Sequence, residues 1–325
     1  MKSSILYLLL LVLYIVLTNC QNEMTFDKLL SDLKKEVKMK IMAIAGADVP
    51  ESLEASRLAK DMKIGDSILI GNEEKIKQIA KDKNIDISDF KIVNIIDPIE
   101  ISRYAVKLVH DGKADMYVKG SLETRDVLKA VLDNEIGLKT NELISLVGVF
   151  EIDGQMKYLT DSSIVPYPTL ENKVQLINNA VKFAASTGLI NPKVAVVTAI
   201  SAPNPRMRET LEAEQLTEMN KRGEIKDCIV DGPLSMDLAI STESANVKGT
   251  QRRINGDADI IIFPDVHAAN IAYKLLTHLT NIKSGNIIIG TSEPVILSSR
   301  SDSVEVKLNS IILGFTYDKF KDQKK

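Results

Sequence analysis

The chain of 325 residues is longer than the size at which a single hydrophobic core keeps growing, so its length favours two lobes over one. Apolar residues make up 45% and charged residues 26% of the sequence, a composition that is typical of globular α/β proteins and excludes a disordered chain. The net charge of −3 gives no electrostatic footprint for nucleic acid or for an anionic membrane surface. Any anion-binding site must therefore be local.

The first 23 residues form an apolar N-terminal segment with two interpretations. Lys2 precedes an apolar run, Ile5–Leu17, which has the length of the hydrophobic region of a signal peptide and is too short to span a membrane. Cys20 stands where a bacterial lipoprotein would be cleaved, although Asn19 replaces the small residue that such a site needs. Alternatively Met24 is the start, because apolar residues follow it at helical spacing: Phe26, Leu29, Leu30, Leu33 and Val37. We favour this second interpretation and expect a cytoplasmic protein.

Strand-like runs alternate with helical patterns over the first part of the chain. Four such runs are each followed by a helix-like segment: 41–45, 67–70, 91–95 and 114–118. Pro50 and Pro98 stand where the first turn of a helix tolerates a missing amide, so we expect helices to begin there. Alternation of this kind predicts a parallel sheet.

The rhythm changes near residue 141. Two strand-like runs, 143–150 and 156–160, are separated by a short segment that contains Asp153 and Gly154, a pair typical of a β-hairpin turn. Alternation then resumes with four further strand-like runs: 193–199, 227–230, 258–263 and 286–289. We therefore predict a first α/β lobe from residues 24–140 plus 291–325 and a second α/β lobe from residues 141–290.

The loop after the run 114–118 is a candidate anion site. Loops that follow the strands of an open parallel sheet lie at the ligand crevice. This loop supplies two cations, a glycine and the amides of a helix N-terminus, all of which suit phosphate: Lys119, Gly120, Ser121, Thr124 and Arg125. The alternative is a simple turn with solvated surface charges.

The segment 290–305 concentrates hydroxyl groups, one arginine and carboxylates, and is the most informative stretch of the sequence. Its structural alternative is that Ser301 or Asp302 caps a last helix whose apolar face includes Val304 and Leu308. The cysteines and histidines predict neither a disulfide framework nor a metal site. There are only two cysteines, Cys20 and Cys228, and the three scattered histidines lack metal-ligand spacing: His110, His267 and His278. We expect Cys228 to be a core residue and no metal to be bound.

Short motifs in order over nearly the whole chain, from Met24 to Phe315, resemble the phosphate acetyl/butyryltransferase family, and more closely its butyryl branch. The matching stretches are Ala114 Asp115 Met116 with Lys119 Gly120, Thr160 Asp161, Asn191–Ala195, Asn204 Pro205 with Met207, Arg222 Gly223, Val230–Leu234 with Asp237, Ala258 Asp259 Ile260, Asn270 with Tyr273 Lys274, Gly290 Thr291 Ser292 with Pro294 Val295, and Ser299 Arg300. The order of the matches makes them far more specific than any single one.

The resemblance implies two α/β lobes with an active-site cleft between them, an architecture shared with isocitrate dehydrogenase-like proteins. It also implies a homodimer that transfers a short acyl group, butyryl or else acetyl or a branched acyl, between coenzyme A (CoA) and inorganic phosphate. Neither a metal nor a redox cofactor is needed for this reaction. An acyl (butyrate) kinase is the functional partner that the resemblance suggests.

The resemblance also assigns roles to residues. Arg300 corresponds to the arginine of the family's serine and arginine pair and would bind phosphate bidentately. Ser299 would donate a hydrogen bond to the carbonyl oxygen as it becomes an oxyanion. The remaining contacts to phosphate and CoA would come from the Lys119 loop named above, from Gly290, Thr291 and Ser292, and from Asn270 and Lys274.

The base that activates the thiol is less well defined. A free thiol has a pKa of about 8.5, so a carboxylate near the CoA sulfur would help to form the nucleophile. In the acetyl branch an aspartate follows the serine and arginine pair, whereas Val306 stands at the corresponding position here. This leaves Asp302 and Glu305 as candidate bases. The sequence also departs from the butyryl branch at Lys139, Leu146 and the pair Ala268 Ala269.

Two other classes of protein are alternatives to an acyltransferase. A decarboxylating dehydrogenase that uses nicotinamide is suggested by the analogy of fold alone, and the sequence has neither G-x-G-x-x-G nor a cluster of metal-binding carboxylates. A non-catalytic exported lipoprotein on the same scaffold is suggested by the N-terminal segment. An exported protein would lie outside the cell's CoA pool.

Overall fold

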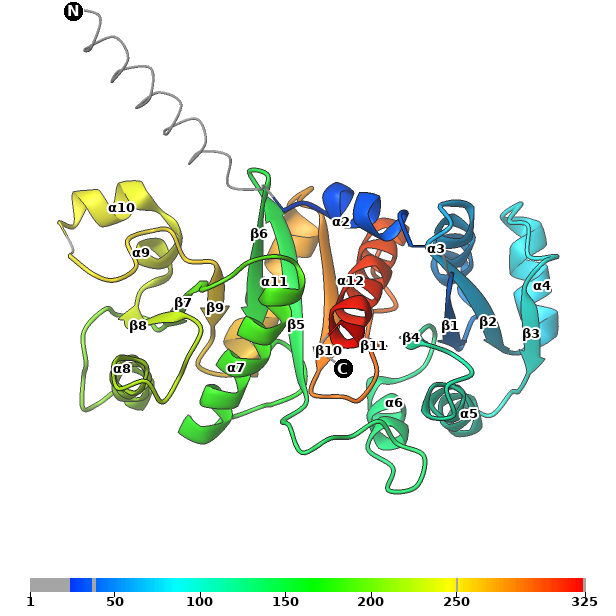
Figure 1. Ribbon diagram of the computed structural model, residues 1–325, viewed down its shortest axis with the longest axis horizontal. Helices are drawn as coiled ribbons and strands as arrows, with labels where there is room; N and C mark the ends of the chain where they lie inside the picture. The colour runs from blue at the N-terminus through cyan, green and yellow to red at the C-terminus, as the bar shows by residue number, and fades with distance from the viewer. Residues whose placement is uncertain (1–23, 37–38, 250, 324–325) are drawn as a thin grey trace, which may run out of the picture.

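One mixed sheet of eleven strands forms the centre of the computed structural model, which describes residues 24–36, 39–249 and 251–323 (Figure 1). The strand order across the sheet is β3-β2-β1-β4-β11-β10-β5-β6-β9-β7-β8. The strands are β1 Lys40–Ala45, β2 Gly65–Gly71, β3 Lys91–Asn94, β4 Met116–Lys119, β5 Ser145–Ile152, β6 Gln155–Thr160, β7 Lys193–Val197, β8 Ile229–Leu234, β9 Ile260–Ile262, β10 Ser284–Ile289 and β11 Val295–Ile296.

Helices follow most of the strands. They are α2 Phe26–Leu33, α3 Pro50–Asp61, α4 Glu73–Asp82, α5 Pro98–His110, α6 Thr124–Val131, α7 Leu170–Ser186, α8 Arg208–Lys221, α9 Met236–Ile240, α10 Thr242–Val247, α11 Val266–Leu279 and α12 Val304–Asp322. The helix starts predicted at Pro50 and Pro98 are confirmed, and the side chain of Asp97 caps α5 by accepting from the amides of Ile99 and Glu100. Within the described residues, none of the helices combines the length and the apolarity that crossing a membrane requires.

Strand direction reverses in the middle of the sheet. β3, β2, β1, β4 and β11 are parallel, whereas β10 runs antiparallel to both β11 and β5. β5 and β6 form the predicted hairpin, in which Asp153 (φ 50°) and Gly154 (φ 75°) both take the positive φ that a type I′ turn demands. Beyond the hairpin, β6, β9, β7 and β8 are parallel again.

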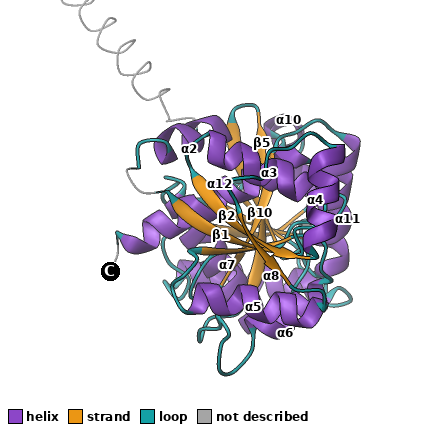
Figure 2. Ribbon diagram, turned by 90° about the vertical axis from the view of Figure 1, so that its right-hand side faces the viewer, coloured by secondary structure: helices purple, strands orange, loops and turns teal. Residues whose placement is uncertain are grey.

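The two faces of the sheet are packed differently, and Figure 2 shows helices on both of them. On one face a single hydrophobic core extends from α3 and β1 under α12 to α7 and α8, and it includes Met42, Ile311 and Val194. On the other face there are two separate cores. One lies beneath α5 and α6, and the other lies beneath α9, α10 and α11. The gap between these two cores is where a site can form.

The α/β class is confirmed, but the predicted lobe boundaries are not visible as a break in the sheet. Residue 141 lies in the loop before β5, and residue 290 lies in the turn between β10 and β11. Because β10 pairs with β11 only at Ile288 and Val295, the two halves are held together mainly by the continuous core under α12. The boundaries stay a prediction. The N-terminal segment 1–23 and Val37 lie outside the described residues.

The last helix begins later in the chain than a cap at Ser301 or Asp302 would place it. Ser303 is the N-cap residue of α12, with its hydroxyl accepting from the amide of Val306 at 3.3 Å. Neither Ser301 nor Asp302 has this role. Asp302 instead turns back and accepts a hydrogen bond from the amide of Ser299, which leaves it available to the site.

Candidate active site

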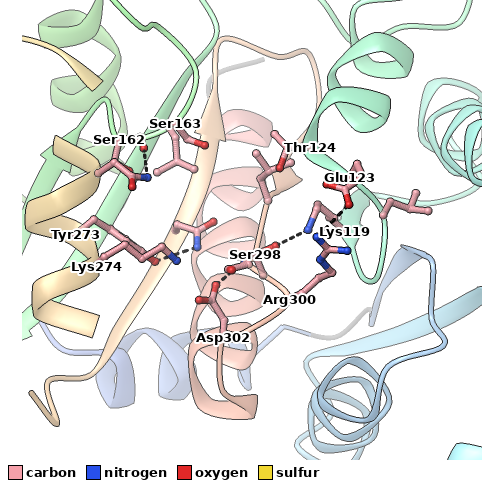
Figure 3. Close-up of a pocket in the computed structure, with 16 residues that line it drawn as sticks. Lys119, Glu123, Thr124, Ser162, Ser163, Tyr273, Lys274, Ser298, Arg300 and Asp302 are labelled. Carbon is pink, nitrogen blue, oxygen red and sulfur yellow. Dashed lines mark hydrogen bonds and ion pairs between the residues drawn. The ribbon is translucent and has the colours of Figure 1, made fainter. Parts of the chain in front are cut away.

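A cavity of about 220 Å³ lies in the gap between the two cores, over the central strands β5 and β10 (Figure 3). One wall comes from β4, the start of α6 and the segment after β11. The opposite wall comes from α11 and the loop after β6. The residues that line the cavity are Lys119, Leu122, Glu123, Thr124, Leu146, Ser162, Ser163, Asn270, Tyr273, Lys274, Asn286, Leu297, Ser298, Ser299, Arg300 and Asp302.

The backbone of Ser298 and Ser299 is held by three charged side chains. β11 is parallel to β4, so the chain leaves β11 beside Lys119, whose Nζ donates to the carbonyl of Ser298 at 2.9 Å. Lys307, from the first turns of α12, donates to the carbonyl of Ser299 at 2.9 Å. The Oδ2 of Asp302 accepts from the amide of Ser299 at 2.7 Å. Since all three charged side chains are buried, these contacts fix the position of the two serines firmly.

This wall of the cavity is electropositive. Burial, together with the neighbouring cations Lys307 and Arg300, lowers the pKa of Lys119 to about 8. Burial also lowers the pKa of Lys307. Arg300 lies at the mouth of the cavity with 58% of its side chain exposed, and it forms an ion pair of 3.0 Å with Glu123. An exposed pair of this kind is weak, so a bound anion can compete for the guanidinium.

The opposite wall is polar but less charged. Asn270 and Lys274 of α11 face the cavity, and the Nδ2 of Asn270 donates to the carbonyl of Ser162 at 2.9 Å. The loop that carries Ser162 is anchored by Asp161, whose carboxylate accepts from the amides of Ser163, Ile164 and Val165. Burial raises the pKa of Asp161 to about 6 and that of Tyr273 well above its ordinary value.

Seven of the residues predicted from the sequence meet at this cavity: Lys119, Thr124, Asn270, Lys274, Ser299, Arg300 and Asp302. Others from the Lys119 loop do not line it. Gly120 packs against the backbone of Gly46, where a Cβ atom would lie 1.9 Å from the carbonyl oxygen, so its role is close packing. Ser121 donates to Asp48 at 2.6 Å, and the side chain of Arg125 is 90% exposed beside Asp126.

Gly290, Thr291 and Ser292 require a correction, because the fold does not bring them to the cavity. The carbonyl of Ser292 accepts from Lys321 in the last turn of α12, whereas the first turns of α12 contact Ser299. Lys307 and Lys321 are separated by about 21 Å along the axis of this helix. The hydroxyl of Thr291 donates to the carbonyl of Glu293 and the carbonyl of Gly290 accepts from Thr140, so both are engaged in the turn between β10 and β11.

The two candidate bases are also separated. Asp302 is 4% exposed and lines the cavity, whereas Glu305 is exposed on the first turn of α12 and does not. Among the described residues, no group of three or more His, Cys, Asp or Glu side chains is placed to hold a metal ion.

The sequence analysis did not identify Ser298 and Asn286, which line the cavity, or Lys307, which holds the backbone of its wall. Ser298 was passed over because the resemblance points to Ser299. Asn286 was treated only as the start of a strand, although an amide in an otherwise apolar buried strand is a signal that was available. Lys307 had no signal, since a lysine four residues after a helix cap is ordinary until its burial is known.

Comparison with known proteins shows which family the chain resembles. The family model described as phosphate acetyl/butaryl transferase matches residues 95–315. The chain is 44% identical over 291 residues to the phosphate butyryltransferase of Clostridium beijerinckii, covering 89% of this chain and 96% of that protein. It is 42% identical over 284 residues to the phosphate acetyltransferase of Thermotoga maritima, covering 86% and 96%.

A solved structure is similar over almost its whole length. The crystal structure of a branched-chain phosphotransacylase from Enterococcus faecalis superposes with a TM-score of 0.76 at 33% identity, covering 86% of this chain and 99% of that one. The sequence identity of these matches favours the acyltransferase over the dehydrogenase alternative. The chain belongs to the phosphate acetyl/butaryl transferase family.

Proposed function

We propose that this protein transfers a short acyl group reversibly between CoA and inorganic phosphate, with butyryl preferred to acetyl or branched acyl groups. Membership of the family supports the reaction, and the relative named as a phosphate butyryltransferase at 44% identity supports the preference. The observation that carries the proposal is the convergence of Lys119, Ser299 and Arg300 on one cavity.

Phosphate would bind on the electropositive wall. The guanidinium of Arg300 offers two parallel donors to phosphate oxygens, and phosphate would replace Glu123 as its partner. The ammonium of Lys119 lies in the same wall, and the amides at the start of α6, next to Thr124, favour an anion. No carboxylate in the described part of the chain forms an ion pair with the buried Lys119, which supports this assignment, because a bound anion would supply the missing charge.

CoA and its acyl group would occupy the rest of the cavity. Asn270 and Lys274 on α11 would contact the CoA moiety, and the apolar side chains of Leu122, Leu146 and Leu297 would line the acyl chain. The carboxylate of Asp302 would accept the proton of the CoA thiol when acyl phosphate is the donor. We choose Asp302 over Glu305 because only Asp302 lies in the wall of the cavity.

Ser299, the candidate from the sequence for the oxyanion contact, lines the cavity as well. Its hydroxyl lies 3.0 Å from the hydroxyl of Ser301, near the exposed mouth where Arg300 also lies. This position is next to the site proposed for phosphate.

The cellular setting follows from the substrates. CoA thioesters are intracellular metabolites, so we propose that the protein works in the cytoplasm. Its acyl phosphate product is a phosphoryl donor, so a kinase that passes the phosphoryl group to a nucleotide, an acyl (butyrate) kinase, is the partner that would consume it. We also propose that the working form is a homodimer, as the family resemblance implies.

A thioester panel tests the proposed reaction. Purified protein should release free CoA thiol from butyryl-CoA only when phosphate is present, because phosphate is the acyl acceptor in that direction. Acetyl, propionyl and branched acyl thioesters should react more slowly, as judged by kcat/KM. Release that does not depend on phosphate, or no release from any of these thioesters, would contradict the proposal.

A further inference from the structure

Asp161 is a buried carboxylate that the proposed reaction does not use. It follows the last residue of β6, is 3% exposed and does not itself line the cavity. No cation of the described residues forms an ion pair with it, and burial is the main cause of its raised pKa. Buried carboxylates are rare unless they are paired, so the groups that replace a cation here call for an explanation.

Backbone amides take the place of the cation. Oδ1 of Asp161 accepts from the amides of Ser163 at 2.8 Å and Ile164 at 3.0 Å, and Oδ2 accepts from the amide of Val165 at 3.2 Å. The backbone amide of Leu146, on the neighbouring strand β5, also favours the charged form of the carboxylate. Both oxygens therefore serve as acceptors, which only an ionised carboxylate can provide in full.

The loop held in this way is joined to α11. The carbonyl of Ser162 accepts from the Nδ2 of Asn270 at 2.9 Å, and the carbonyl of Pro166 accepts from the amide of Val266, the first residue of α11, at 3.0 Å. Figure 3 shows Ser162 and Lys274 on the same side of the cavity. The shape of the loop therefore bears on the position of the helix face that lines this wall.

We propose that the ionised carboxylate of Asp161 is a positioning group for acyl-CoA, which sets the loop 162–165 and, through Ser162, the side chain of Asn270. This inference rests on the proposed function and adds a residue through which the binding of one of the two substrates depends on pH. The wall proposed for phosphate comes from β4, α6 and the segment after β11, none of which carries this loop. Phosphate binding should therefore be independent of Asp161.

The pH dependence has a direct structural cause. Burial raises the pKa of Asp161 to about 6, against the opposing effect of the amides that bind it. Below this pH the carboxyl group carries a proton, and one of its oxygens becomes a donor that faces a backbone N–H group. No ionisable side chain of the described parts of β5, β6 or α11 contributes to this shift. Histidines titrate in the same range, so His267, in the first turn of α11, needs a control.

The matched variants Asp161→Asn and His267→Gln test the inference. In the wild type the KM for butyryl-CoA should rise by about 3- to 10-fold as the pH falls from about 7.5 to 5.5, the range expected for one lost hydrogen bond. Asp161→Asn should show the higher KM at every pH, because an amide cannot ionise and presents a donor to one of the loop amides. His267→Gln should keep the profile of the wild type.

The KM for phosphate provides the internal control. Phosphate itself titrates near neutral pH, so Asp161→Asn is compared with the wild type at each pH, and the two values should agree throughout. In an Asn270→Ala background, Asp161→Asn should raise the KM for butyryl-CoA less than it does alone, because the contact through which it acts is already gone.

Stability separates a positioning role from a general loss of structure. The pKa of Asp161 is higher in the folded chain than its ordinary value of 3.8, so the folded chain binds more protons between pH 4 and 6. The stability contributed by this group therefore falls as the pH rises through that window and is greatest in acid. A rise of the KM in acid cannot then come from unfolding driven by Asp161, and the thermal midpoint of Asp161→Asn at pH 7.5 should stay unchanged or rise.

Three results would overturn the inference. They are a KM for butyryl-CoA that stays flat from pH 7.5 to 5.5 in the wild type, a pH dependence that is lost in His267→Gln, and an equal change of both KM values in Asp161→Asn. The first two need no substitution at Asp161, so the test stands even if that variant fails to fold. Absence of phosphate-dependent thiol release in the wild type would overturn the proposed function instead.

Discussion

Lys119 is a buried cation whose charge state depends on its surroundings. It lies at the end of β4 with 4% of its surface exposed, and burial together with Lys307 and Arg300 lowers its pKa from 10.5 to about 8. Above this pH the ammonium loses its proton, and with it the attraction for phosphate. We therefore predict that the KM for phosphate rises as the pH passes through 8. Rates measured against phosphate concentration between pH 7 and 9.5 would check this.

The same shift has a consequence for stability. Because the pKa of Lys119 is lower in the folded chain than in the unfolded chain, the unfolded chain binds more protons between pH 8 and 10.5. Folding stability contributed by this group therefore rises as the pH increases through that window. In Lys119→Met both effects should disappear, leaving a phosphate KM that is high at every pH. A wild-type KM for phosphate that stays flat from pH 7 to 9.5 would show that Lys119 does not bind phosphate.

At the scale of elements, α12 connects the site to the rest of the fold. Its first turns supply Lys307, which donates to the carbonyl of Ser299, and its middle packs in the continuous core through Ile311 and Leu313. Lys307 does not line the cavity, so we regard it as a positioning residue that acts through the segment it holds.

Lys307→Met should have two separable effects. Loss of the hydrogen bond to Ser299 should lower kcat, and loss of a neighbouring cation should raise the pKa of Lys119, because Lys307 is one of the groups that lower it. The rise of the phosphate KM should therefore move to higher pH. The control Lys307→Arg keeps the positive charge and should leave the pH at which the phosphate KM rises unchanged. If this pH is the same in both variants as in the wild type, Lys307 has only a structural role.

The elements also show what the sequence could and could not predict. Alternating patterns, Pro50, Pro98 and the Asp153 Gly154 turn located most strands and helices, because each of these signals is local. β11 has only two residues and no pattern of its own, so it was missed. Without β11, Ser292 and Ser299 looked like parts of one loop, although they contact opposite ends of α12.

At the scale of the whole molecule, the cavity exists because one face of the sheet carries two cores in place of one. The sequence resemblance predicted a cleft between two halves of the chain, and residues from both halves do line the cavity, with Lys119 and Arg300 on one side and Asn270 and Lys274 on the other. The resemblance could not predict how Ser298 and Ser299 differ in their contacts. The carbonyls of the two serines accept hydrogen bonds from Lys119 and Lys307, and the hydroxyl of Ser299 pairs with that of Ser301.

This arrangement predicts that the two halves of the cavity serve different substrates. Lys274→Met, on α11, should raise the KM for butyryl-CoA several-fold and leave the KM for phosphate unchanged. Arg300→Ala, on the opposite wall, should raise the KM for phosphate by roughly 10- to 100-fold, the range expected when a charged hydrogen bond worth about 1.5–3 kcal/mol is lost, and leave the KM for butyryl-CoA unchanged. The measurement is a two-substrate initial-rate matrix for each variant.

The control and the double variant make this test decisive. Glu123→Gln removes the present partner of Arg300 at 3.0 Å and should keep or lower the KM for phosphate, because the guanidinium is released for the anion. In Lys274→Met combined with Arg300→Ala, the KM for butyryl-CoA and the KM for phosphate should each rise by the factor seen in the corresponding single variant, since sites on opposite walls act independently. Both variants acting on the same substrate, or a double variant no worse than one single variant, would mean that the two walls do not divide the substrates between them.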